Sequence, residues 1–89
     1  MQRPRSYLAE AYTARSRAAE VEAAARRATV AAAALAETGR AVRYVRTVFV
    51  PGDETCFYLF EADAAEDVAD ALRRARIDCE RIVEADLLK

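Results

Sequence analysis

The segment that most constrains the fold of this chain is 42–62, VRYVRTVFVPGDETCFYLFEA, which predicts two β-strands joined by a tight turn. Residues 42–50 are dense in β-branched and aromatic side chains, which favour strands. The turn sequence PGDE follows, in which proline fixes φ, glycine permits positive φ and aspartate can bond to nearby backbone. A second strand is expected over Thr55–Glu61. The remaining segments are expected to pack on this hairpin or to pair with it.

One helix is expected on each side of the hairpin. The alanine-rich segment Arg17–Thr38 places apolar residues at helical spacing, and Gly39 after it is a typical helix terminator. The sequence DAAE that begins at Asp63 resembles a capping box, and it opens a second helix that is expected to end near Arg76.

Short strands at Tyr7–Tyr12 and Ile82–Leu87 complete a β-α-β-β-α-β order. Residues 1–6 are expected to form a flexible N-terminal arm, and residues 7–89 a single domain. The order predicts an α+β, ferredoxin-like sandwich with a four-stranded antiparallel sheet. Right-handed crossovers give the strand order fourth, first, third, second. Both helices then cover one face of the sheet and leave the other face open.

Alternation along each strand assigns the side chains to the two faces of the sheet. The residues expected beneath the helices are Ala9, Ala11, Val45, Thr47, Phe49, Phe57, Leu59, Val83, Ala85 and Leu87. The residues expected on the open face are Leu8, Glu10, Tyr12, Val42, Tyr44, Arg46, Val48, Val50, Cys56, Tyr58, Phe60, Ile82, Glu84 and Asp86. A one-residue slip in any strand would exchange its assignments.

An open face of this composition is too apolar to remain in water. We therefore expect a homodimer in which two sheets face each other as a dimeric α/β barrel, with a cavity between them. A different protein covering the face is the alternative.

The overall composition excludes several classes of function. The chain has 89 residues, enough for one domain, and its net charge of −1 argues against nucleic acid or an anionic membrane as partner. No apolar run approaches the ~20 residues of a membrane-spanning helix. The absence of histidine removes the commonest general base and metal ligand. Cys56 and Cys79 are not in a C-x-x-C arrangement and are expected to stay reduced in a cytoplasmic protein.

A few polar side chains on the predicted open face are the candidates for a site. Catalytic candidates are Glu10, Arg46 and Tyr58. Candidates for ligand binding are Tyr12, Tyr44, Cys56, Phe60 and Glu84. Burial would raise the pKa of a carboxylate such as Glu10, and Arg46 could neutralise it. An ion pair buried at the dimer interface is the alternative explanation.

Three motifs carry a resemblance to a known family: VRYxRT, the run PGDETCFYLFEA at 51–62, and RIVEA at 81–85. With the opening strand YLAEAY, they resemble a family of small, mainly actinobacterial proteins catalogued as a domain of unknown function, which includes a nickel-binding protein. The arginine- and alanine-rich composition is typical of such high-GC organisms. The resemblance implies a ferredoxin-like fold, a cytoplasmic homodimer and a divalent metal such as nickel. The side chains left to hold a metal are Glu10, Cys56, Glu84 and Asp86, which suit nickel poorly because it favours nitrogen and sulfur donors.

Three functions remain open at this stage. The first is a dimeric binding protein that holds a small molecule or metal ion between its sheets. The second is a cofactor-free enzyme, a cyclase, isomerase or oxygenase of polyketide-like substrates, with Glu10 as general base and Arg46 with Tyr44 or Tyr58 stabilising an oxyanion. The third is a purely structural domain. Binding leads because no set of residues requires a reaction.

Overall fold

The computed structural model describes residues 4–88. The strands are β1 (Arg5–Tyr12), β2 (Val42–Val50), β3 (Thr55–Ala62) and β4 (Arg81–Ala85). The helices are α1 (Val21–Glu37) and α2 (Ala65–Arg74), and two 3₁₀ turns are η1 (Arg15–Glu20) and η2 (Pro51–Asp53). Of the predicted flexible arm, residues 1–3 lie outside the described residues, whereas Arg5 and Ser6 already belong to β1.

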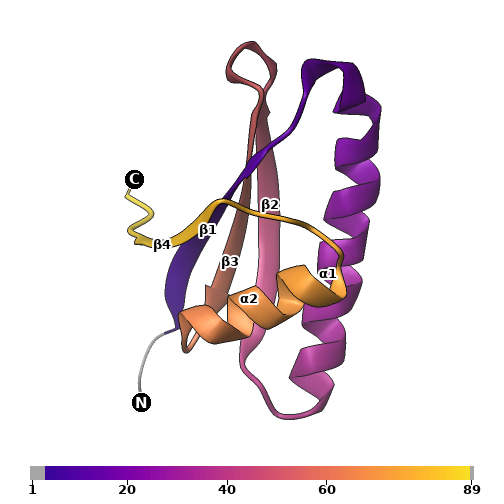
Figure 1. Ribbon diagram of the computed structural model, residues 1–89. Helices are drawn as coiled ribbons and strands as arrows, with labels where there is room; N and C mark the ends of the chain where they lie inside the picture. The colour runs from indigo at the N-terminus through magenta and orange to yellow at the C-terminus, as the bar shows by residue number, and fades with distance from the viewer. Residues whose placement is uncertain (1–3, 89) are drawn as a thin grey trace.

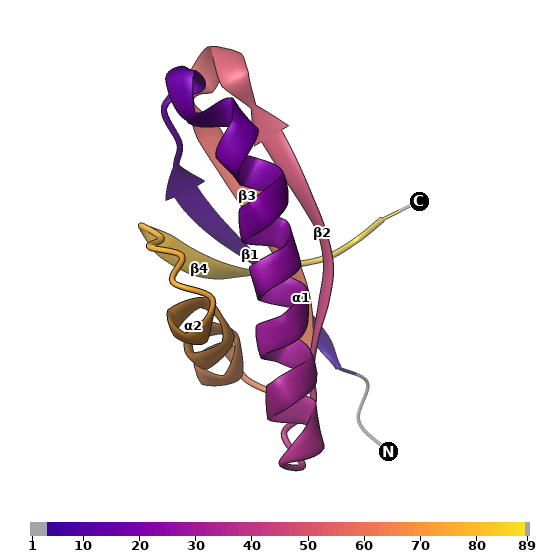
Figure 2. The same cartoon turned by 90° about the vertical axis from the view of Figure 1, so that its right-hand side faces the viewer.

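The four strands form one antiparallel sheet in the order β2-β3-β1-β4. Both helices lie on the same side of this sheet, and no helix covers its other side within residues 4–88 (Figures 1 and 2). The ferredoxin-like arrangement and the predicted strand order are therefore confirmed. We call the two sides of the sheet the helix face and the open face.

The hydrophobic core lies between the helices and the helix face. The helix α1 contributes small side chains to it, mainly alanines such as Ala28, together with Leu35. Small residues let the helix approach the sheet, and the space that remains is filled by large side chains from the strands. Tyr7, Tyr58 and Phe60 fill it, and each is no more than 4% exposed.

The predicted face assignment is wrong for β3. Phe60 lies opposite Tyr7, and Tyr58 lies opposite Ala9, so all four side chains share the helix face. Cys56 joins them opposite Ala11, whereas Phe57 and Leu59 lie on the open face. The assignment failed because residues 56–60, CFYLF, are apolar at every position. Such a run lacks the alternation of apolar and polar residues that identifies the buried face of a strand.

A β-bulge divides β2 into two halves of opposite phase. The register against β3 shifts between Tyr44 and Arg46. After the shift, Thr47 and Phe49 lie on the helix face, and Arg46, Val48 and Val50 on the open face, as predicted. Before it, the prediction is inverted: Val42 and Tyr44 lie on the helix face, opposite Ala62 and Phe60.

The assignment for β4 is also inverted. Ile82 lies opposite Ala9 and Glu84 opposite Tyr7, so both lie on the helix face, whereas Val83 and Ala85 lie on the open face. The strand ends at Ala85, so the predicted extension through Leu87 is wrong as well. In β1 the prediction is right: Ala9 and Ala11 face the helices.

Candidate functional site

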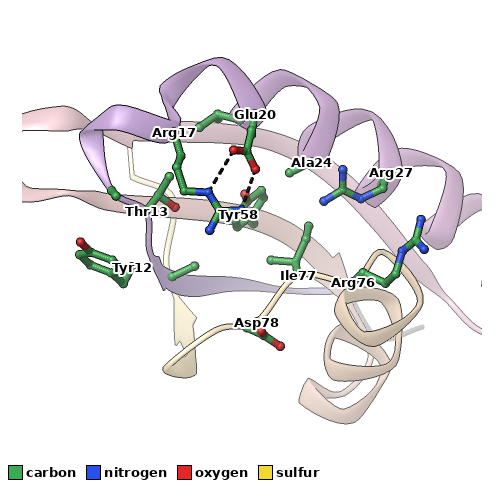
Figure 3. A pocket seen from close by; sticks show the side chains of 13 residues that line it. Tyr12, Thr13, Arg17, Glu20, Ala24, Arg27, Tyr58, Arg76, Ile77 and Asp78 are labelled. Atoms are coloured by element: carbon green, nitrogen blue, oxygen red, sulfur yellow. Dashed lines mark hydrogen bonds and ion pairs between the residues drawn. The ribbon is translucent and has the colours of Figure 1, made fainter.

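A concave site lies on the helix face, where the end of β1, the start of α1 and the linker after α2 meet (Figure 3). Its volume is about 230 Å³. Its lining residues are Ala11, Tyr12, Thr13, Ala14, Arg17, Glu20, Val21, Ala24, Arg27, Tyr58, Arg76, Ile77 and Asp78. We call it the Tyr58 pocket. Tyr58 is the one residue that the central strand β3 contributes to its lining.

Tyr58 supplies the pocket with an aromatic ring and one hydroxyl group. The residue is 3% exposed. Burial raises the pKa of its phenol well above the ordinary value, and the neighbouring Cys56 raises that pKa further. The hydroxyl group therefore stays protonated throughout the physiological range, so that it can donate a hydrogen bond.

Cys56 lies two residues before Tyr58 on β3, on the same face of the sheet, and is completely buried. Burial raises the pKa of its thiol, while hydrogen bonds with Tyr58 and Thr13 act in the opposite direction. The thiolate is the form that attacks electrophiles and binds metals, and a raised pKa disfavours it. Cys56 therefore acts here as a small core residue with a hydrogen-bonding sulfur.

The rim of the pocket is charged. Arg17 in η1 makes a two-pronged ion pair with Glu20, with nitrogen–oxygen distances of 3.0 and 2.8 Å (Figure 3). This bond lowers the pKa of the Glu20 carboxyl group, which is fully ionised as a result. Arg27 donates a hydrogen bond from Nε to the carbonyl oxygen of Ala75 at 2.8 Å. Its guanidinium group therefore links α1 to the end of α2 beside the pocket.

Backbone hydrogen bonds hold the two segments that enclose the pocket. The amide of Thr13 donates to the carbonyl oxygen of Glu54 at 2.8 Å, and the amide of Arg15 donates to the Glu54 carboxylate at 2.8 Å. On the other side, the amide of Ile77 donates to the carbonyl oxygen of Leu72 at 2.9 Å. The entrance is thus tied to the β2–β3 turn and to the end of α2.

The predicted site residues do not form one site. Glu10 and Arg46 project from the open face, whereas Tyr58, Cys56, Phe60 and Tyr44 lie on the helix face. Glu10 makes an ion pair with Arg81 of β4, with a nitrogen–oxygen distance of 3.0 Å. The sheet separates Glu10 from Tyr58, so these two side chains do not share one site within the described chain.

Two of the predicted residues, Tyr12 and Tyr58, do line the pocket. Phe60 is completely buried in the core, and Tyr44 packs edge-on against it while bonding through its hydroxyl group to Thr47 at 2.6 Å. Glu84 is exposed on β4.

The predicted metal ligands do not fit a metal site. Glu10 lies on the open face, Cys56 is buried in the core, and Glu84 is exposed on β4. Within residues 4–88, no three histidine, cysteine, aspartate or glutamate side chains gather closely enough to hold an ion. Glu10, Cys56 and Glu84 are therefore not brought together within residues 4–88.

Sequence reasoning missed the charged residues of the pocket: Arg17, Glu20, Arg27, Arg76 and Asp78. One signal was available. No glycine follows the second helix, although helices commonly end on a residue with positive φ, and Arg76 occupies that position with φ of 57°. A side chain placed where glycine is favoured is a reason to examine its surroundings.

The fold is shared with a solved structure. The crystal structure of SCO4226 from Streptomyces coelicolor A3(2) matches with a TM-score of 0.73 at 18% sequence identity, over 94% of this chain and 99% of that one. No family model and no curated protein matches the chain. The likeness shows that the chain shares its ferredoxin-like α+β fold with a protein of an actinobacterium. Within residues 4–88, no helix is long and apolar enough to cross a membrane.

Proposed function

We propose that this protein binds a small molecule and that the Tyr58 pocket is the binding site. The observation that carries the proposal is a protonated, buried tyrosine at the base of a cavity of about 230 Å³. The pocket brings convergent polar and charged groups, a smaller apolar surface and a shifted pKa together, and these features mark a candidate small-molecule site.

The pocket favours a ligand of one ring with an oxygen acceptor. An apolar cavity of about 150 Å³ holds benzene, so 230 Å³ accommodates a substituted ring. Ala24, Val21 and Ile77 offer apolar surface, and the Tyr58 hydroxyl group offers a donor. An oxygen acceptor on the ligand would take this hydrogen bond in place of the Cys56 sulfur, which is a weak acceptor.

The chemistry of the pocket supports binding more than catalysis. A general base or nucleophile needs a pKa that leaves its active form populated near neutral pH. The pKa values of Tyr58 and Cys56 are both raised, which disfavours their anions, and Glu20 is held by Arg17.

A screen of monocyclic compounds by ligand-observed NMR tests this proposal. We expect compounds with a carbonyl or phenolic oxygen to bind, and Tyr58→Phe to weaken them by about tenfold, the value of one hydrogen bond. Tyr44→Phe is the matched control, because Tyr44 shares the helix face but does not line the pocket. Binding that is equal in the wild type and Tyr58→Phe would contradict the proposed site.

The open face supports a second function, assembly as a homodimer. Its centre is apolar, with Leu8, Phe57 and Leu59 on adjacent strands, and Val48 beside them is 51% exposed. The ion pairs Glu10–Arg81 and Arg43–Glu61 lie on the same face. An apolar centre with a charged rim is the usual anatomy of an interface, and a face carrying both signs of charge can complement a copy of itself.

Sedimentation velocity tests the dimer. We expect a species of twice the 9.8 kDa chain mass, and Val48→Glu should shift it to the monomer because a charge would be buried at the interface. Val30→Glu is the matched control, since Val30 is an exposed valine on α1. A wild-type monomer at high concentration would rule out the homodimer and leave the Tyr58 pocket unaffected.

A further inference from the structure

A second concave surface, which we call the arginine groove, lies between α1 and the C-terminal end of α2. Figure 1 shows that end of α2 reaching α1. The groove has a volume of about 550 Å³ and is lined by Ala23, Arg26, Arg27, Val30, Ala31, Ala34, Arg74 and Arg76. The α1 residues recur at intervals of three and four, so they form one stripe along the helix.

The charge of the groove is of one sign. Among residues 4–88, four arginines and no acidic residue line it, although the whole chain has a net charge of −1. Arg27 caps the end of α2 through its Nε. Arg26, Arg74 and Arg76 make no side-chain hydrogen bond or salt bridge with any residue between 4 and 88. Their guanidinium groups are therefore available to an anion.

The surface between the arginines is apolar. Val30 is 69% exposed, the largest exposed fraction of any β-branched apolar residue in the described chain, and the alanines of the stripe extend the surface on both sides of it. Arginines around an apolar floor complement a molecule that carries both a negative charge and an apolar part.

The end of α2 shows that Arg76 is held in position at a cost. The amide of Ile77 donates to the carbonyl oxygen of Leu72, and that of Arg76 donates to Arg73, which together form a Schellman motif. Its residue with positive φ is Arg76, at 57°, where glycine is favoured. The motif directs an arginine to the boundary of the groove and the Tyr58 pocket, which Arg27 and Arg76 both line (Figure 3).

We propose that the arginine groove binds a free carboxylate with a linear apolar chain. The carboxylate accepts hydrogen bonds from Arg26, Arg74 or Arg76, and the chain lies along Val30 and the alanines. The groove adjoins the Tyr58 pocket, with which it shares Arg27 and Arg76, and its occupant differs in kind from the ring-shaped ligand proposed there.

The test is a titration of the ¹⁵N-labelled full chain with octanoate, followed by NMR. We expect saturable shifts at the amides of Ala23, Val30 and Ala34, and at least tenfold weaker binding of octylammonium, which has the same chain and the opposite charge. Acetate, which lacks the chain, should also bind at least tenfold more weakly. Equal binding of octanoate and octylammonium would overturn the proposal, because it would show an apolar surface without charge selection.

The amides that shift separate this proposal from the proposed function. Octanoate shifts confined to Thr13 and Val21 would place the ligand in the Tyr58 pocket and overturn the groove as its site. An absence of octanoate binding would overturn the proposal that the groove binds a carboxylate. The screen of monocyclic compounds would still test the Tyr58 pocket separately.

Arg76→Gly is the sharpest variant, because glycine suits the backbone at this position. We expect its melting temperature to rise and its affinity for octanoate to fall at least threefold. The double variant Arg26→Gln with Arg74→Gln should bind octanoate at least tenfold more weakly than the wild type. Arg73→Gln is the matched control: it neighbours Arg74 on α2, pairs with Asp70 and does not line the groove. An unchanged affinity in Arg76→Gly and in the double variant would overturn the proposal.

Discussion

The two faces of one sheet have different neighbours although the same strands supply both. On the helix face, Ala9, Cys56 and Phe60 are completely buried. On the open face, Leu8 and Phe57 are only half-buried. Phe57 and Phe60 are the same residue type three positions apart. Their difference shows that a strand residue acquires its environment from the layer packed against its face.

Leu59 sharpens this comparison. It is 6% exposed, yet it lies on the open face and does not belong to the main hydrophobic core. Neighbouring side chains on the central strands shield it without a second layer. The open face thus already has a dry centre in a single chain, which is the position where a partner would gain most by covering it.

The largest loss of stability is expected on truncation of Phe60, and truncation of Phe57 should cost much less. Phe60→Ala removes a fully buried ring and should lower the free energy of unfolding by about 3–5 kcal/mol. Phe57→Ala should cost less than half of that in a monomer, because its ring is partly solvated. Urea unfolding followed by circular dichroism measures both. Equal costs would mean that a partner covers the open face in solution.

Overpacking of the helix face should rank second. Ala28 of α1 is completely buried against the sheet, and Ala28→Leu should destabilise the protein by about 1–3 kcal/mol. Ala36→Leu makes the same change at an exposed position of α1 and should leave stability nearly unchanged. Thermal unfolding of the two variants compares them. A neutral Ala28→Leu would show that space remains between α1 and the sheet.

The buried tyrosine should give the helix face a sensitivity to alkaline pH. The folded-state pKa of Tyr58 is raised, so the folded chain holds this proton more tightly than the unfolded chain does. The resulting stability is complete below about pH 10, the ordinary pKa of tyrosine, and is lost as the pH rises above it.

This loss has an upper limit of about 1.4 kcal/mol per pH unit, the value for one proton. Urea unfolding between pH 9.5 and 11.5 measures the slope, and Tyr58→Phe should flatten it. Tyr44→Phe is the control for removal of a phenol elsewhere on the helix face. An unchanged slope in Tyr58→Phe would show that other groups cause the alkaline loss.

The smallest effect belongs to the ion pair on the open face. Arg81 is 65% exposed and Glu10 is 33% exposed, so water weakens their attraction. Arg81→Gln should lower the free energy of unfolding by less than about 1 kcal/mol. In about 0.5 M salt the wild type and the variant should differ even less in stability. A larger cost at concentrations where the protein is dimeric, and not at dilution, would assign the pair to the interface.

The sequence alone determined the elements and their order. The hairpin at 42–62 combines residues that favour strands with a proline–glycine turn, and the alanine-rich segment before it favours a helix. These preferences are local, so they can be recognised without knowledge of the contacts. Right-handed crossovers then fixed the strand order β2-β3-β1-β4.

The face of each side chain was decided by the tertiary structure. The bulge at Tyr44–Arg46 exchanges the two faces for the first half of β2. No residue type near the bulge indicates this shift in register. In the apolar run at 56–60, Tyr58 and Phe60 turn inward because the alanines of α1 leave a volume that only large side chains fill. The Tyr58 pocket and the arginine groove follow from the same packing, since each joins residues from α1 to residues beyond α2 that lie some 50 positions later in the chain.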